Sequence, residues 1–130
     1  MIRALILSLC LIAPTAQAQN SSLIRLTDRD DLFGSEAVGR LAKAGEGTCT
    51  GALSAADMVL TAAHCVSHAG TGTMDPAKVT FRAGYRDGQS IAEAKGTRIA
   101  VHQGYDPDAP STIARALHAM ALLQLDTPIH

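Results

Sequence analysis

The stretches CTGAL at residues 49–53 and MVLTAAHC at residues 58–65 are the most informative parts of this chain of 130 residues. The second stretch has the aliphatic residues of a short strand, followed by small residues that predict a tight turn with close backbone approach. That turn presents His64 directly beside Cys65. A disulfide to Cys49 would hold the histidine on a rigid base. Such rigidity suits a general base, whose geometry matters before its pKa.

The first residues have the three-part pattern of a secretory signal peptide. Arg3 provides a positive start, residues 4–13 form an apolar run, and the small residues of 16–18 predict cleavage after Ala18. The alternative is a membrane anchor, but the apolar run is shorter than the roughly 20 residues needed to cross a bilayer core of ~30 Å. We therefore predict a secreted or periplasmic protein without a membrane anchor.

Cleavage after Ala18 would remove Cys10 and leave two of the 3 cysteines, Cys49 and Cys65. An even pair of cysteines in a secreted chain predicts one disulfide. The chain-entropy model assigns about 3 kcal/mol to a bond that closes a loop of roughly 15 residues. This is a large share of the stability of a small domain.

Length and composition exclude several classes of protein. The length suits one domain, and the 47% content of hydrophobic residues argues against a disordered chain. The net charge is −1, from 11 Lys and Arg against 12 Asp and Glu, so no basic excess is available to neutralise phosphates. The chain has only 2 Tyr, 2 Phe and no Trp, so it offers few aromatic side chains on which nucleic-acid bases could stack. We therefore expect no nucleic-acid partner.

The pattern of the mature chain predicts an all-β fold. Residues 19–36 are predicted to form a polar leader, and residues 37–130 the folded domain. Short runs with the character of strands alternate with turn-rich stretches, at residues 37–42, 48–53, 58–61, 79–84, 97–102 and 120–125. With no long amphipathic helix between them, they predict an antiparallel β-barrel or a sandwich.

The last part of the chain has two readings. The nearly continuous apolar run at 120–125 is typical of a strand buried on both faces. The wider stretch 112–125 has the Ala, Leu and Met content of a helix, although burial can override that propensity.

The two informative stretches closely resemble the trypsin-like (chymotrypsin-family) serine proteases. The match comprises the C-x-G-x-L strand, the spacing of the two cysteines and the pentapeptide TAAHC. Further on, VHQGYD at 101–106 is similar to the family's V-H-P-x-Y, with Gln103 in place of proline, and ALLQLDTPI at 121–129 is similar to A-L-L-x-L-x-x-P-I/V. The resemblance runs from about Val38 to His130. It implies the antiparallel N-terminal barrel of a two-barrel fold.

The resemblance also implies roles for single residues. His64 matches the general base that takes a proton from the nucleophilic serine. The aspartate that orients this histidine falls at Ala119, and alanine has no acceptor for the imidazole N–H. The nucleophile of the family lies in a G-D-S-G-G stretch of the second barrel, and the chain has no such stretch before it stops at His130. The AVGR stretch at 37–40 better matches the first barrel strand than an activation site.

Zinc is the main rival use of the histidines. His64 and His68 are four positions apart with Cys65 between them, so on a helix they would share a face. No glutamate follows His64 as in H-E-x-x-H, and Cys65 is expected in a disulfide. We therefore predict no metal site and no cofactor. His68, together with His102, His118 and His130, is expected to be exposed or in a loop.

Two further pairs of side chains are conceivable substitutes for the missing groups. Asp106 and Asp108 are conceivable orienting carboxylates, but loop carboxylates beside prolines are more often solvated. Ser54 and Ser67 lack the glycine-rich elbow and the oxyanion donors that a nucleophile needs.

Two functions follow, and whether this chain is an enzyme stays open between them. In the first, it is the N-terminal half of a secreted trypsin-like serine endopeptidase, whose partner is a protein or peptide substrate once a second barrel is supplied. In the second, it is a non-catalytic, protease-derived binding module, a pseudoprotease. Ala119 favours the second, because truncation does not explain a substitution within the retained part. A local frame error around residues 112–120 would explain both Ala119 and the alanine-rich run.

Overall fold

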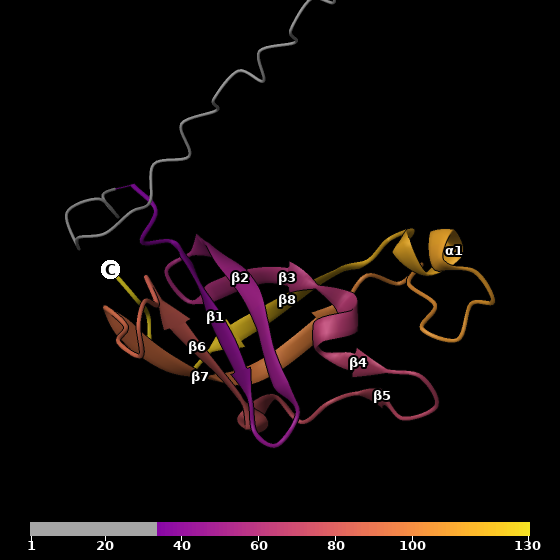
Figure 1. Cartoon of the computed structure of the whole chain (residues 1–130), viewed down its shortest axis with the longest axis horizontal. Coiled ribbons are helices and arrows are strands. Elements are labelled where there is room, and N and C mark those ends of the chain that lie inside the picture. Colours follow the sequence, from indigo (N-terminus) through magenta and orange to yellow (C-terminus); the bar gives the residue numbers. More distant parts are fainter. Residues whose placement is uncertain (1–33) are drawn as a thin grey trace, which may run out of the picture.

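Six antiparallel strands close into a barrel in the computed structural model, which describes residues 34–130 (Figure 1). The strand order around the barrel is β1-β2-β3-β8-β7-β6, and pairing of β6 with β1 closes it. The strands are β1 Val38–Lys43, β2 Gly47–Ala55, β3 Met58–Ala62, β6 Val79–Ala83, β7 Ala92–Val101 and β8 Met120–Leu125. The all-β, antiparallel barrel predicted from the sequence is confirmed. The predicted signal peptide and most of the polar leader lie outside the described residues.

Short elements join the barrel strands. They are the 3-10 helices η2 (Ala63–Cys65) and η3 (Pro76–Lys78), the strands β4 (Ser67–His68) and β5 (Gly72–Thr73), and the helix α1 (Thr112–Ala116). Strands β4 and β5 pair only with each other. In Figure 1 this hairpin and α1 extend from the same end of the barrel. The sequence pattern did not predict the hairpin.

The core fills the inside of the barrel. Its largest fully buried side chains are Phe81, Leu41, Leu123, Val59, Val66 and Val79. Along β6 buried and half-buried residues alternate, as expected for a strand with one face toward a core. The glycine of the C-x-G stretch is Gly51, and the packing of the core explains it. A Cβ at this position would lie 2.6 Å from Cγ1 of Val59. Only glycine lets β2 approach the core this closely.

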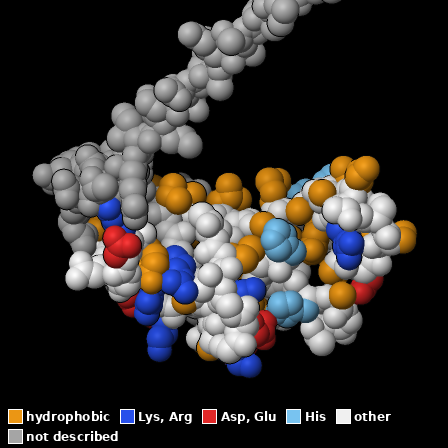
Figure 2. Space-filling view, in the orientation of Figure 1, with side chains coloured by type: hydrophobic (Ala, Val, Ile, Leu, Met, Phe, Trp, Pro, Cys, Tyr) orange, Lys and Arg blue, Asp and Glu red, His pale blue; other side chains and the backbone are white. Residues whose placement is uncertain are grey.

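Strand β8 is not buried on both faces, so that prediction was wrong. Leu123 is fully buried, whereas Met120 and Leu122 are 54% and 38% exposed. A barrel strand has a single inward face, and among the described residues nothing covers the outer side of these two side chains. Figure 2 shows hydrophobic side chains along the edge of the molecule that faces upward in this view.

The stretch with two readings divides into a helix and a strand. Ser111 is the N-cap of α1. Its Oγ accepts a hydrogen bond from the backbone N–H of Ala114 at 3.1 Å. The chain then turns at His118, whose φ of 57° lies in the left-handed region, and β8 begins at Met120. Helical propensity therefore prevails only over residues 112–116, where the chain is not paired in the sheet.

Strand β7 begins five residues before the predicted start at 97, at Ala92. Its inward residues there are Ala94 and Gly96, and its outward residues are Glu93 and Lys95. The alternation is present, but the inward side chains are too small to be recognised as apolar in the sequence. Within residues 34–130, no helix has the length and apolar character needed to cross a lipid bilayer.

Candidate active site

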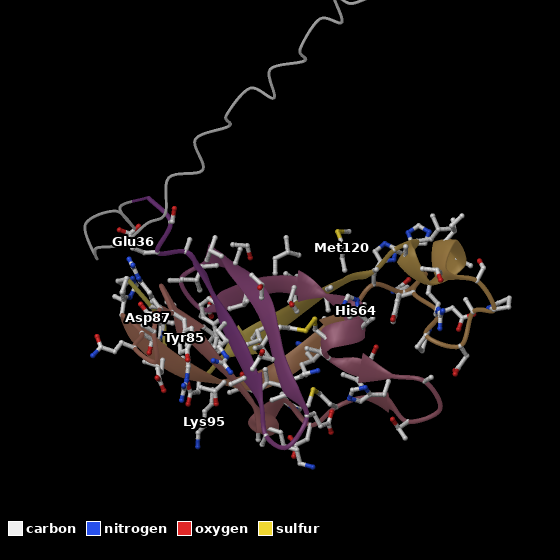
Figure 3. All side chains as sticks on the ribbon, viewed as in Figure 1. Glu36, His64, Tyr85, Asp87, Lys95 and Met120 are labelled. Atoms are coloured by element: carbon white, nitrogen blue, oxygen red, sulfur yellow. A yellow bond between two sulfur atoms is a disulfide. The ribbon has the colours of Figure 1, made fainter. Side chains whose placement is uncertain are left out.

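His64 lies in the turn η2 that directly follows β3, at the end of the barrel that carries α1 (Figure 3). The disulfide between Cys49 and Cys65 joins this turn to β2, with 6.1 Å between the two Cα atoms. The backbone N–H of Val66 donates to the carbonyl of Ala63 at 3.1 Å. The imidazole itself is exposed. The turn is therefore held by the disulfide and by its own backbone hydrogen bond, while the ring stays accessible.

The sulfur atoms of Cys49 and Cys65 and a ring nitrogen of His64 lie within 4.8 Å of one another. Both sulfurs are bonded to each other, so neither is the thiolate that binds zinc. The other histidine of the zinc alternative, His68, points its Nε2 to Oε2 of Glu46 at 2.6 Å. With both sulfurs in the disulfide, His64 is the one ligand of this group of three that stays available.

Ala119 lies next to the turn of His64. Its carbonyl accepts a hydrogen bond from the backbone N–H of Ala63 at 3.0 Å, and the following residue, Met120, pairs with Ala62 in the sheet. His64 and Ala119 both line one pocket of about 540 Å³. The position that the resemblance assigns to the orienting aspartate is thus beside the histidine, but it presents a methyl group without a hydrogen-bond acceptor.

The rest of this pocket comes from three segments: the region of β4, the loop after β7, and α1. The residues contributed are Ser67, His68 and Ala69, then Tyr105 and Pro107, then Thr112, Arg115 and Ala116, with Ala62 from β3. Tyr105 is the tyrosine of the VHQGYD stretch. Arg115 belongs to no motif, and only the return of α1 over the turn brings it to the pocket.

The carboxylates considered as substitutes do not line this pocket. Oδ1 of Asp106 accepts a hydrogen bond from the backbone N–H of Asp108 at 2.9 Å. Both side chains are exposed. The carboxylate of Asp106 therefore stabilises a turn of this loop.

The two serines considered as nucleophiles donate their hydroxyls to backbone carbonyls. Ser67 is 7% exposed and donates to the carbonyl of Ala63 at 3.1 Å. Ser54 donates to the carbonyl of Met58 at 3.2 Å. Ser67 therefore supports the turn of His64 from within.

The remaining histidines are on the surface. The rings of His102 and His118 stack with centroids 4.6 Å apart and an angle of 6° between their planes. Nδ1 of His102 accepts a hydrogen bond from the backbone N–H of Gly104 at 3.0 Å. The stack joins the end of β7 to the residue pair that precedes β8.

A closed six-stranded antiparallel barrel that holds an exposed histidine on a disulfide-braced turn defines the class of protein. It is the class of the trypsin-like barrels. The family model described as Trypsin matches residues 34–130, and the chain belongs to this family. No curated protein matches the chain in sequence.

Solved structures of three proteases or protease relatives have the same fold. The scabies mite inactivated protease paralogue S-D1 superposes with a TM-score of 0.58 at 20% identity, over 76% of this chain and 37% of its own. A Glu endopeptidase in complex with MPD superposes with a TM-score of 0.57 at 22% identity, over 72% of this chain and 40% of its own. The VesB protease of Vibrio cholerae superposes with a TM-score of 0.55 at 24% identity, over 72% of this chain and 28% of its own. The chain therefore spans less than half the length of each of these proteins.

Proposed function

We propose that the chain provides the first barrel and the general base of a secreted trypsin-like serine endopeptidase. In this proposal residues 1–18 are a signal peptide, 19–36 a polar leader and 37–130 the barrel. His64 takes the proton from a serine that a second barrel provides, and the substrate is a protein or peptide. The observation that carries the proposal is the accessible imidazole of His64 on its braced turn, beside a pocket of about 540 Å³.

The proposed chemistry needs both nitrogens of the imidazole. One nitrogen accepts the serine proton, and the N–H on the other side must be held by an acceptor, so that the ring keeps the correct tautomer. Ala119 offers no acceptor, and the imidazolium formed during acylation also has no counter-charge from this position. We therefore expect that the chain of 130 residues does not hydrolyse peptide bonds by itself.

Ala119 also supports a second candidate function, a non-catalytic binding module. Ala119 lies directly before β8, in a part of the chain where the barrel is retained, so the missing carboxylate is not accompanied by a disrupted strand. One of the structures with this fold is an inactivated protease paralogue. The same fold thus occurs in a protein described as an inactivated protease.

Turnover of a peptide ester by the purified chain tests the expected inactivity. We expect the same background rate for the natural chain and for His64→Ala. Turnover that disappears in His64→Ala would contradict the expectation, because it would mean that this chain already contains a working nucleophile.

Nitrogen NMR of His64 tests the role of position 119 without a second barrel. In the natural chain we expect the ring to exchange between tautomers, and in Ala119→Asp we expect the proton to stay on Nδ1, held by the new carboxylate. The matched control is Ala116→Asp, which adds the same charge to another residue that lines the pocket. An unchanged ring in Ala119→Asp would show that this position does not orient His64.

The nucleotide sequence after codon 130 distinguishes the two functions. A reading frame that encodes G-D-S-G-G supports the endopeptidase. A second barrel in which that serine is also replaced supports the pseudoprotease.

A further inference from the structure

A row of polar side chains crosses the outer surface of the barrel, on strands β7, β6, β1 and β2. In the strand register Glu93 is opposite Arg82, Arg82 is opposite Arg40, and Arg40 is opposite Thr50. Leu41 and Phe81 are fully buried, so their neighbours in β1 and β6 face outward. Figure 2 shows Lys and Arg side chains gathered over this part of the barrel. Two like charges directly opposite in a sheet destabilise it unless they are compensated.

Only one of the two arginines has a carboxylate partner among the described residues. Nε of Arg82 lies 3.2 Å from Oε1 of Glu93, and the hydroxyl of Ser90 donates to the same oxygen at 2.8 Å. Arg40 instead donates from Nη1 to the hydroxyl of Tyr85 at 2.7 Å. Its Nε is buried without a hydrogen-bond partner in this part of the chain. Within residues 34–130, no carboxylate therefore compensates the charge of Arg40.

The ring of Tyr85 lies near both guanidinium groups. The central carbon of Arg40 lies 4.7 Å from the centroid of the tyrosine ring, and that of Arg82 lies 6.0 Å from it. Figure 3 shows Tyr85 beside β6 and β1. The ring attracts both cations through its negative face. Arg40 is itself half-buried and lines a pocket on this side of the barrel.

Arg40 and Tyr85 line a shallow pocket of about 470 Å³, together with Thr48, Thr50 and Val38. No carboxylate of the described residues lines it. The tyrosine hydroxyl accepts from Arg40 and still has its own proton to donate, and the threonine hydroxyls can donate as well. A guanidinium binds a carboxylate through two parallel N–H bonds. The pocket therefore has the donors that an oxyanion needs.

We propose that this pocket, which we name the anion pocket, binds a carboxylate side chain of an acidic peptide or protein partner. One uncompensated positive charge matches the single negative charge of a carboxylate better than the double charge of a phosphate. Val38 at the edge of the pocket is 49% exposed and offers apolar contact to the methylene groups of Asp or Glu. The anion pocket shares no residue with the pocket of His64. A test of carboxylate binding there is therefore independent of the proposed catalytic role of His64.

The test measures binding of a fluorescent peptide rich in Asp and Glu to the full chain, beside a peptide of the same sequence with Asn and Gln. We expect the acidic peptide to bind, the neutral peptide to bind at least about tenfold more weakly, and added salt to weaken the difference. Arg40→Gln should weaken binding about tenfold and Tyr85→Phe about threefold. Arg98→Gln is the matched control, because it removes the same charge from an exposed position on β7.

Arg40→Lys keeps the proposal testable if Arg40→Gln does not fold, which a thermal melt of each variant would reveal. Lysine retains the charge but loses the two-point geometry, so we expect binding intermediate between that of the natural chain and that of Arg40→Gln. Full binding by folded Arg40→Lys would contradict a bidentate contact.

Three outcomes would overturn the anion pocket. Equal losses in Arg40→Gln and Arg98→Gln would mean that general surface charge attracts the peptide. Inorganic phosphate that competes at the concentration of the peptide itself would assign the pocket to a free anion. Binding that appears only after Asp28, Asp30 and Asp31 are changed to Asn would assign it to the acidic segment of this chain rather than to a partner.

Discussion

The amide nitrogen of Ala63 lies 3.0 Å from the carbonyl oxygen of Ala119, and this hydrogen bond joins the turn of His64 to the start of β8. The bond is between backbone atoms, so it does not depend on which side chain stands at position 119. An aspartate introduced there would therefore begin from the same backbone position, at the pocket that the histidine lines.

The first prediction concerns Ala119→Asp in a fusion that adds a second barrel with G-D-S-G-G after His130. Loss of the aspartate from the catalytic triad costs about 10⁴ in kcat, which corresponds to roughly 5 kcal/mol of transition-state stabilisation. We expect the substitution to raise kcat by several orders of magnitude with little change in KM, because it acts on the transition state. Steady-state kinetics on a peptide ester measures both constants.

Two controls accompany that fusion. His64→Ala should remove the gain, and Ala119→Asp in the chain of 130 residues should produce no turnover. If the fusion were equally active with and without Ala119→Asp, another carboxylate, such as Asp106 or Asp108, would orient His64.

The second prediction concerns the disulfide between Cys49 and Cys65. Replacement of both residues by serine should lower the free energy of unfolding by about 2–5 kcal/mol, because the cross-link restricts the unfolded chain. Denaturant titration of the two forms measures the difference. Quantitative labelling of Cys65 by a thiol reagent in the native protein, without reductant, would contradict the bond.

The third prediction compares two neighbouring leucines of β8. Leu123 is fully buried and Leu122 is 38% exposed. Leu123→Ala should cost about 2–5 kcal/mol of stability, because it leaves a cavity in the core. Leu122→Ala should cost much less, because its side chain faces outward. Similar losses of stability in both variants would mean that the outer face of β8 is covered in solution.

The fourth prediction concerns export. We expect the secreted protein to begin at Gln19, because the small residues of 16–18 follow an apolar run. The intact mass of the protein recovered from the medium or periplasm measures the cleavage site. A mature protein that retains residues 1–18 would refute the signal peptide.

The strands that the sequence predicts best are those with strong side-chain contrast. In β6, Val79, Phe81 and Ala83 alternate with Thr80 and Arg82, and this alternation places the strand almost to the residue. In β7 the contrast is weak, because the inward residues Ala94 and Gly96 are small. Its first half was therefore missed. The local pattern reports burial only when a buried side chain is large enough to be distinguished from its neighbours.

The candidate site divides in the same way. The turn of His64 and the pairing of Cys49 with Cys65 were predicted, because the small residues, the histidine and the cysteines lie close in sequence. The contribution of Arg115 and Tyr105 to the pocket was not predicted, because they reach it only through the return of the chain after β7. The sequence also did not predict that Arg40 lies opposite Arg82 in the sheet. The two residues are on β1 and β6, whose pairing closes the barrel.

The sequence by itself determined the family and the positions of His64 and Ala119, because these depend on motifs of contiguous residues. Only the tertiary structure decided which side of β8 faces water. It showed that Met120 and Leu122 are exposed although their run is apolar throughout. Closure of the barrel is the physical reason: it gives every strand one inward face, and hydrophobicity alone does not reveal which residues of an apolar strand are turned away from the core.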